Sequence, residues 1–265
     1  MPAFAALPLL QALDERDVVP RAVVASGFGC LVAALWASGL SAAEIEAQLG
    51  RDFGARTLRR TQIGAGLSLL GFGTGRLGHR ALWREGRFRA LLDRWFGSKR
   101  FEDLSFPLSL CLTDVENATL VRADQGRLSD AVYAGCAHFP LLPPALINGR
   151  GVCDGSCLQP LPVLAASRYP GPILALEAFV RTQHGPRRFE NLHGQLFGIF
   201  HRHIVGLHLQ SVRVIHPWPV YCRRICVAEI GDAWDPAVAT LAIKAGRDAL
   251  RIAPTELASV LGRAA

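Results

Sequence analysis

The sequence predicts an α/β fold, a three-layer sandwich with a mainly parallel central sheet, as a single domain over residues 1–265. Apolar runs typical of strands alternate along the chain with segments of helical periodicity, which is the order of elements in α/β proteins. The chain has 265 residues, of which 50% are hydrophobic, so it can bury a large core. A strand, a tight turn and a buried helix follow one another near the N-terminus and form the first unit of such a fold.

This first unit spans residues 23–39, VVASGFGCLVAALWASG. Strand, small-residue turn and helix is the build of a nucleophile elbow, which holds a side chain above a sheet beside a helix N-terminus. A working elbow has the sequence Gly-x-Ser-x-Gly. Here the five residues run from Ala25 to Gly29, and Gly27 stands at the centre. The scaffold of the elbow is therefore present, but the nucleophile position is a glycine.

The other elements follow from periodicity and from turn residues. Helical spacing predicts helices at residues 3–14, 42–49, 84–96, 129–137, 193–209 and 235–250. Apolar runs between turn residues predict strands at 108–113, 119–122, 173–179, 212–216 and 225–230, and a short hairpin at 147–152. The recurring glycines among apolar residues at about 50–78 predict a flexible, partly apolar flap. A phosphate-binding loop is the alternative, but the Lys-Ser/Thr pair of such a loop is missing.

Charge and cysteine usage restrict the partners and the compartment. The net charge is +7 and the pI is about 9.4, so the surface favours anionic partners such as phospholipid headgroups or acidic proteins. The arginines are scattered, so we expect no nucleic-acid partner. Seven cysteines in core-like segments indicate a reducing compartment and therefore a cytoplasmic protein. The basic surface leaves open a peripheral position at anionic membranes.

Two further expectations concern the N-terminal region. The first ten residues lack a basic segment, which predicts that no signal peptide is present. Residues 23–40 are apolar enough to suggest a membrane span, but the glycines inside them favour a buried strand, turn and helix. We expect no cofactor.

Several stretches together resemble the patatin-like phospholipase family, in the order that the family has them. Residues 25–39 are similar to its elbow and following helix, GTSAGALVAALYASG. Residues 88–107 resemble the segment before its central strand, the Thr-Asp pair at 113–114 matches its T-D element, and residues 128–144 resemble its S-A-A-I-P region. Residues 148–163, NGRGVCDGSCLQPLPV, resemble its D-G-[GA] loop and the N-P-L-P-V that follows.

The resemblance implies an α/β sandwich and a Ser-Asp dyad that hydrolyses acyl esters of lipids. Asp154 then occupies the position of the dyad aspartate, with Gly155 behind it, and Gly29 is the last glycine of the elbow. The dyad serine falls on Gly27, and Ala25 replaces the first elbow glycine. The glycine-rich oxyanion turn of the family would fall before residue 3, so we expect most of it to be missing.

Other side chains offer different chemistry. Ser26 lies one residue before the nucleophile position, either as an alternative nucleophile or as a turn hydroxyl bonded to the backbone. Cys30 opens the helix after the turn, where the dipole could activate a thiol, although a small buried residue is the simpler interpretation. Two C-x3-C pairs, at 153–157 and 222–226, and four histidines on the helix at 193–209 could bind metal, but we expect no metal site.

Three hypotheses follow. The first is a non-catalytic patatin-like protein that binds a lipid or acyl ligand in an apolar pocket under the flap, with its basic surface toward anionic membranes. The second is an active lipid acyl hydrolase that uses Ser26 or another side chain as the nucleophile. The third is an interaction subunit that pairs with an intact paralogue or another protein. Esterase activity that depends on Asp154 would separate the second hypothesis from the others.

Overall fold

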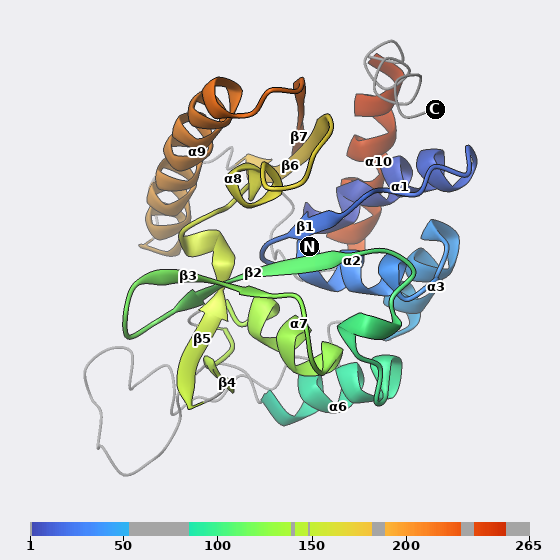
Figure 1. Ribbon diagram of the computed structural model, residues 1–265, viewed down its shortest axis with the longest axis vertical. Coiled ribbons are helices and arrows are strands. Elements are labelled where there is room, and N and C mark those ends of the chain that lie inside the picture. Colours follow the sequence, from blue (N-terminus) through green and yellow to red (C-terminus); the bar gives the residue numbers. More distant parts are fainter. Residues whose placement is uncertain are drawn as a thin grey trace.

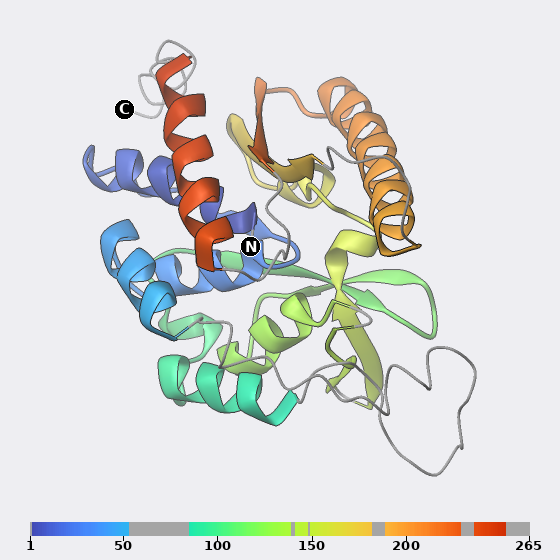
Figure 2. The same cartoon turned by 180° about the vertical axis from the view of Figure 1, so that it is seen from behind.

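The computed structural model describes residues 2–52, 85–138, 141–147, 149–181, 189–228 and 236–252. Nearly all of the predicted flap at residues 50–78 lies outside these ranges. Helices and strands alternate in the described chain, which confirms the α/β class (Figures 1 and 2). None of the described helices is long and apolar enough to cross a membrane.

The N-terminal third builds the elbow unit and the helices around it. A short 3-10 helix, η1 (Pro2–Ala6), leads into α1 (Leu7–Asp14), and the chain then forms β1 (Val23–Ala25), α2 (Gly29–Ala37) and α3 (Ala42–Asp52). Every side chain of α2 from residue 30 to residue 37 is buried. A carboxylate ties these helices together, because Asp14 accepts one hydrogen bond from the Trp36 indole at 2.8 Å and another from the Ala42 amide at 3.1 Å.

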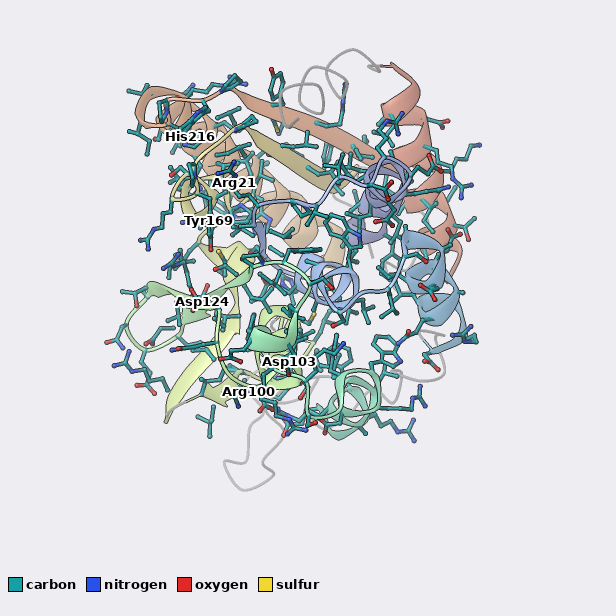
Figure 3. All side chains as sticks on the ribbon, turned by 45° about the vertical axis from the view of Figure 1, so that its right-hand side comes forward. Arg21, Arg100, Asp103, Asp124, Tyr169 and His216 are labelled. Carbon is teal, nitrogen blue, oxygen red and sulfur yellow. The ribbon has the colours of Figure 1, made fainter. Side chains whose placement is uncertain are left out.

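The rest of the chain completes two sheets and their helices. The central part comprises α6 (Glu85–Phe96), η2 (Phe101–Asp103), β2 (Leu108–Asp114), β3 (Thr119–Ala123), α7 (Leu128–Cys136), β4 (Ala145–Ile147), β5 (Arg150–Asp154) and η3 (Gly155–Cys157). The C-terminal part comprises α8 (Val163–Ala166), β6 (Ile173–Arg181), α9 (Phe189–Ile215), β7 (Val220–Ala228) and α10 (Pro236–Ile252). Before β2, the Arg100 amide donates to the Asp103 carboxylate at 2.9 Å and fixes the turn. Figure 3 labels these two residues among the side chains of the described chain.

The larger sheet has five strands in the order β1-β2-β5-β4, with β3 also paired to β2. The fully buried β2 is its centre, and only the β1–β2 pair in this sheet is parallel. The sequence predicts a mainly parallel sheet, so this detail requires correction: the sheet is mixed. Short connections, which can join antiparallel strands only, account for the β2–β3 and β4–β5 pairs. Asp114 accepts the amides of Glu116 and Asn117 at 3.0 Å each and turns β2 directly back into β3.

The smaller sheet pairs β6 and β7 in parallel, with α9 as the crossover between them. One cluster of buried apolar side chains includes residues of both sheets, such as Leu110 of β2 and Val227 of β7. The predicted strand at residues 212–216 is wrong, because α9 continues to Ile215 and the His216 amide still bonds the Val212 carbonyl at 2.9 Å. The β-branched side chains there suggest a strand, but Val212 packs inward from a helix, and packing outweighs that propensity.

Candidate active site

The predicted elbow is present at the end of β1. β1 pairs in parallel with β2, Ala25 opposite Leu110, and the chain turns sharply before α2 begins at Gly29. Gly27 has a φ of +60°, in the left-handed region where a residue with a side chain is strained. The Gly27 carbonyl accepts the Cys30 amide at 3.0 Å, so the turn leads directly into the helix. This is the strained strand-to-helix turn on which a nucleophile stands in α/β hydrolases.

Residue 27 faces the carboxylate of Asp154. A Cβ atom built on Gly27 would lie 3.5 Å from Asp154 Oδ1 and 3.9 Å from Oδ2, which are ordinary van der Waals distances. The same Cβ would lie 3.8 Å from the Cβ of Ser156. Sequence positions 27 and 154 are thus brought together as the Ser-Asp pair of the resemblance requires, with the serine side chain missing.

Asp154 is the last residue of β5 and is 3% exposed. Its carbonyl accepts the Thr113 hydroxyl at 2.9 Å, so the T-D element of β2 holds the strand end in place. Gly155 follows at a point where the backbone is crowded. A Cβ atom there would lie 2.1 Å from the carbonyl oxygen of Cys111, which no real side chain tolerates. Only glycine therefore fits behind the aspartate.

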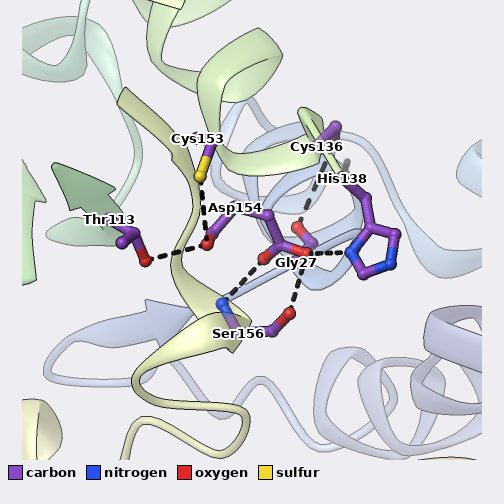
Figure 4. A network of polar contacts seen from close by, with 7 residues as sticks. All are labelled: Gly27, Thr113, Cys136, His138, Cys153, Asp154 and Ser156. Atoms are coloured by element: carbon purple, nitrogen blue, oxygen red, sulfur yellow. Dashed lines mark hydrogen bonds and ion pairs between the residues drawn. The ribbon is translucent and has the colours of Figure 1, made fainter. Parts of the chain in front are cut away.

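Both oxygens of the Asp154 carboxylate already have partners (Figure 4). Oδ1 accepts the Ser156 amide at 2.7 Å, and Oδ2 accepts the Ser156 hydroxyl at 2.7 Å. His138 Nδ1 lies 2.8 Å from Oδ2. Burial alone would lower the pKa of His138, but the hydrogen bond with Asp154 and the negative charge of its carboxylate outweigh burial and raise this pKa. The carboxylate is therefore held by two neighbours instead of a nucleophile.

Neither His138 nor the role of Ser156 was predicted from the sequence. Ser156 stands at the third position of the D-G-[GA] loop, where a hydroxyl is unusual for the pattern, and that departure was the available signal. His138 directly follows the helix α7 and the S-A-A-I-P-like region. Its contact with Asp154 depends on how the end of α7 lies against β5, which periodicity and spacing do not reveal.

Ser26 is placed differently from Gly27. Its hydroxyl oxygen is buried, and no residue that the structure describes forms a hydrogen bond with it. The partners that hold the Asp154 carboxylate are Ser156 and His138. A Cβ atom built on Gly29, the first residue of α2, would meet no other atom of the described residues within 4 Å.

Three buried thiols near the elbow have raised pKa values, which disfavour the reactive thiolate. Burial, with the nearby charges of Cys136 and Asp154, raises the pKa of Cys30 well above its ordinary value. Burial and the charge of Asp154 do the same to the pKa of Cys136, and burial raises the pKa of Cys111 to about 11. The close contact between α2 and α7 requires a glycine at position 135, where a Cβ atom would lie 2.6 Å from the Cys30 sulfur.

The remaining cysteines and histidines that the structure describes lie in two regions, beside Asp154 and along the C-terminal part of the chain. Among the described residues, no group of three or more histidines, cysteines or carboxylates is arranged to hold an ion. Cys153 and Cys157 do contact each other, and a hydrogen bond from Cys153 lowers the pKa of Cys157 to about 7. On α9, burial lowers the pKa of His201 and of His208, which share the predicted face.

A left-handed elbow at the start of a buried helix, facing an aspartate at the end of another strand of the same sheet, is the arrangement expected of α/β proteins built on an acyl-hydrolase scaffold. A sequence profile of the patatin-like phospholipase family matches residues 3–167, and the chain belongs to this family. Its fold is also similar to the crystal structure of VipD from Legionella pneumophila, with 14% sequence identity and a TM-score of 0.49. That match covers 95% of this chain but 64% of VipD, so the chain spans less than two thirds of VipD.

Proposed function

We propose that this protein is a non-catalytic patatin-like phospholipase homologue that binds a lipid or acyl ligand at its elbow site. The observation that carries the proposal is Gly27, whose missing side chain would point at Asp154 from 3.5 Å. In a Ser-Asp dyad the carboxylate accepts the proton of the serine hydroxyl while the oxygen attacks the acyl carbonyl. Residue 27 has no atom that can make this bond.

The state of Asp154 supports the same conclusion. A general base must be free to take a proton from its nucleophile. Here the Ser156 amide, the Ser156 hydroxyl and the His138 ring occupy both carboxylate oxygens. The network keeps the buried charge satisfied without a nucleophile, so the loss of the serine leaves no unpaired group behind.

A lipid or acyl ligand is supported by family membership, since patatin-like phospholipases act on lipids. Gly29, whose Cβ position has no described atom within 4 Å, is the first residue of the buried helix α2, and a helix N-terminus favours a carbonyl or carboxylate head. Cytoplasmic localisation is supported by the cysteines, because all seven are free.

Ester hydrolysis tests the catalytic half of the proposal. We expect the native chain, Asp154→Asn and Ser26→Ala to release p-nitrophenolate from short-chain and long-chain p-nitrophenyl esters at the rate of buffer. If the native chain hydrolyses an ester and Asp154→Asn abolishes this, the protein is an enzyme. A loss on Ser26→Ala as well would then identify that serine as the nucleophile.

Titration with a fluorescent long-chain fatty acid tests the ligand half. We expect saturable binding that Gly29→Phe weakens, because the added ring fills the space before α2. Gly86→Phe is the matched control, since residue 86 also lies in a helix with open space around it. Equal binding by the two variants would show that the ligand does not occupy the elbow site.

A further inference from the structure

The crossover helix α9 carries apolar side chains on the side that faces solvent. They recur at helical spacing and form what we call the outer face of α9: Leu196, Ile199, Phe200, Leu207 and Val214. Phe200 is 63% exposed and Val214 is 85% exposed. Figures 1 and 2 show α9 at the periphery of the molecule, beside α8. The exposed His203 completes this stripe.

The opposite side of α9 is apolar as well. Val205 and Val212 are 1% and 0% exposed and pack in one cluster with residues of α8 and β6, including Val163 and Ile173. A surface helix of a soluble protein normally has one apolar stripe toward the core and a polar face toward water. The inner stripe accounts for the folding of α9, so the outer face requires a second apolar environment.

The charges around this helix indicate what that environment is. The sequence contains no aspartate or glutamate from residue 191 to residue 228. Arg202 and Arg213 are exposed and lie, by helical spacing, along one edge of the outer face. Trp218 follows the end of the helix and is 43% exposed. Its ring centroid lies 5.2 Å from that of His216, with the two rings tilted by 55°, and His216 Nε2 lies 2.8 Å from the Gly171 carbonyl oxygen.

We propose that the outer face of α9 docks this protein onto an anionic lipid bilayer, with the helix in the plane of the membrane surface. Apolar side chains on one face, arginines at its edge and a tryptophan at its end are the features of interfacial helices. The arginines contact lipid phosphates while the apolar stripe enters the boundary of the acyl chains. A second copy fits less well, because a two-fold contact through this face brings no carboxylate of residues 191–228 to the arginines.

This docking surface is separate from the elbow. α9 lies outside the residues that match the family profile, 3–167, and the hydrogen bonds to the Asp154 carboxylate come from Ser156 and His138, not from the outer face of α9. The opposite side of the helix is nearer the elbow, because the charges of Asp154 and His138 act on His201 there. The proposal therefore does not depend on whether the elbow site hydrolyses an ester or binds an acyl chain.

The proposed membrane docking is tested by co-sedimentation of the full chain with vesicles of phosphatidylcholine, with and without phosphatidylserine. We expect binding to the anionic vesicles, weakened by high salt. The double variant Phe200→Gln/Val214→Gln should lose roughly tenfold for each substitution, because each removes an apolar side chain from the membrane. Arg202→Gln/Arg213→Gln should lose roughly fivefold for each arginine on anionic vesicles only. Leu146→Gln is the control, since this side chain is 74% exposed on the distant β4.

Three outcomes overturn the proposal. The first is that the native chain fails to sediment with anionic vesicles. The second is that the Phe200→Gln/Val214→Gln variant sediments as well as the native chain. The third is that Leu146→Gln reduces binding as much as Phe200→Gln/Val214→Gln does. Light scattering of the same samples distinguishes the other occupant: a dimer that Phe200→Gln/Val214→Gln dissociates, without vesicle binding, assigns the face to a second copy. Unchanged circular dichroism confirms that each variant is folded. Hydrolysis of esters by the native chain would refute the proposed function and leave docking intact.

Discussion

Replacing Gly27 by serine should restore the missing half of the dyad. The Cβ of the new residue lies 3.5 Å from Asp154 Oδ1 and clashes with nothing. Its hydroxyl is one bond further and in a suitable rotamer comes within hydrogen-bond reach of the carboxylate, about 2.6–3.2 Å. The substitution Gly27→Ser should therefore place a nucleophile on the elbow without rebuilding the site.

The stability cost can be estimated from the backbone. A φ of +60° costs a residue with a side chain about 1–2 kcal/mol relative to glycine. The lower entropy of the unfolded chain returns about 0.4–1 kcal/mol. The net loss of about 1 kcal/mol lowers the melting temperature of a protein of this size by roughly 2–4 °C. Gly27→Ser should thus stay folded, and thermal unfolding followed by circular dichroism checks this.

The catalytic gain depends on freeing the carboxylate. In Gly27→Ser the new side chain is nearest Oδ1, and a hydroxyl that turns toward Oδ2 competes with that of Ser156, which already donates there. The double variant Gly27→Ser/Ser156→Ala removes the competitor, so we expect it to be the faster of the two on p-nitrophenyl esters. A positioned general base contributes at least about a hundredfold, and Asp154→Asn in the same background should remove that gain. If both variants are folded and neither exceeds buffer, residue 27 does not occupy a working nucleophile position.

Three further predictions concern the scaffold and its titrating groups. Gly155→Ala should destabilise the protein by roughly 3 kcal/mol or more in urea unfolding, because its Cβ would overlap a backbone carbonyl 2.1 Å away; Gly151→Ala, which meets no atom within 4 Å, should change little. The contact with Asp154 raises the pKa of His138. The stability that this contact contributes is therefore complete below the unfolded-state pKa of the histidine and disappears as pH rises through the folded-state pKa. His138→Gln should destabilise the protein more at acidic than at alkaline pH, and equal losses at both would contradict this. The exposed Cys157, with its pKa lowered to about 7 by a hydrogen bond from the neighbouring thiol, should react with iodoacetamide faster than any other cysteine at neutral pH, as mass spectrometry of tryptic peptides can show.

The elbow could be predicted from the sequence because it is a local structure. An apolar strand, small turn residues and a helix with a uniformly apolar surface define it within seventeen residues, 23–39, and the structure places them as predicted. The position of Asp154 came from the resemblance to a family rather than from periodicity. The structure brings residues 27 and 154 together through the pairing of β2 with β1 and β5, which joins segments far apart in the chain.

What the sequence did not predict depends on contacts between elements. The bond between His138 and Asp154 requires the end of α7 to meet the end of β5. The prediction of a mainly parallel sheet was wrong in part because Asp114 closes a tight turn after β2. This turn makes β2 and β3 an antiparallel hairpin. On α9, Val212 packs inward from a helix although its neighbours have strand-forming side chains.

Reaction with a serine-directed fluorophosphonate, read by intact mass, is the most direct test of the central claim that the elbow keeps its geometry without its nucleophile. The native chain should show no added mass, and Gly27→Ser should gain one adduct on residue 27. An adduct on the native chain that Asp154→Asn prevents would contradict the account, because it would show that another side chain serves Asp154 as an activated nucleophile.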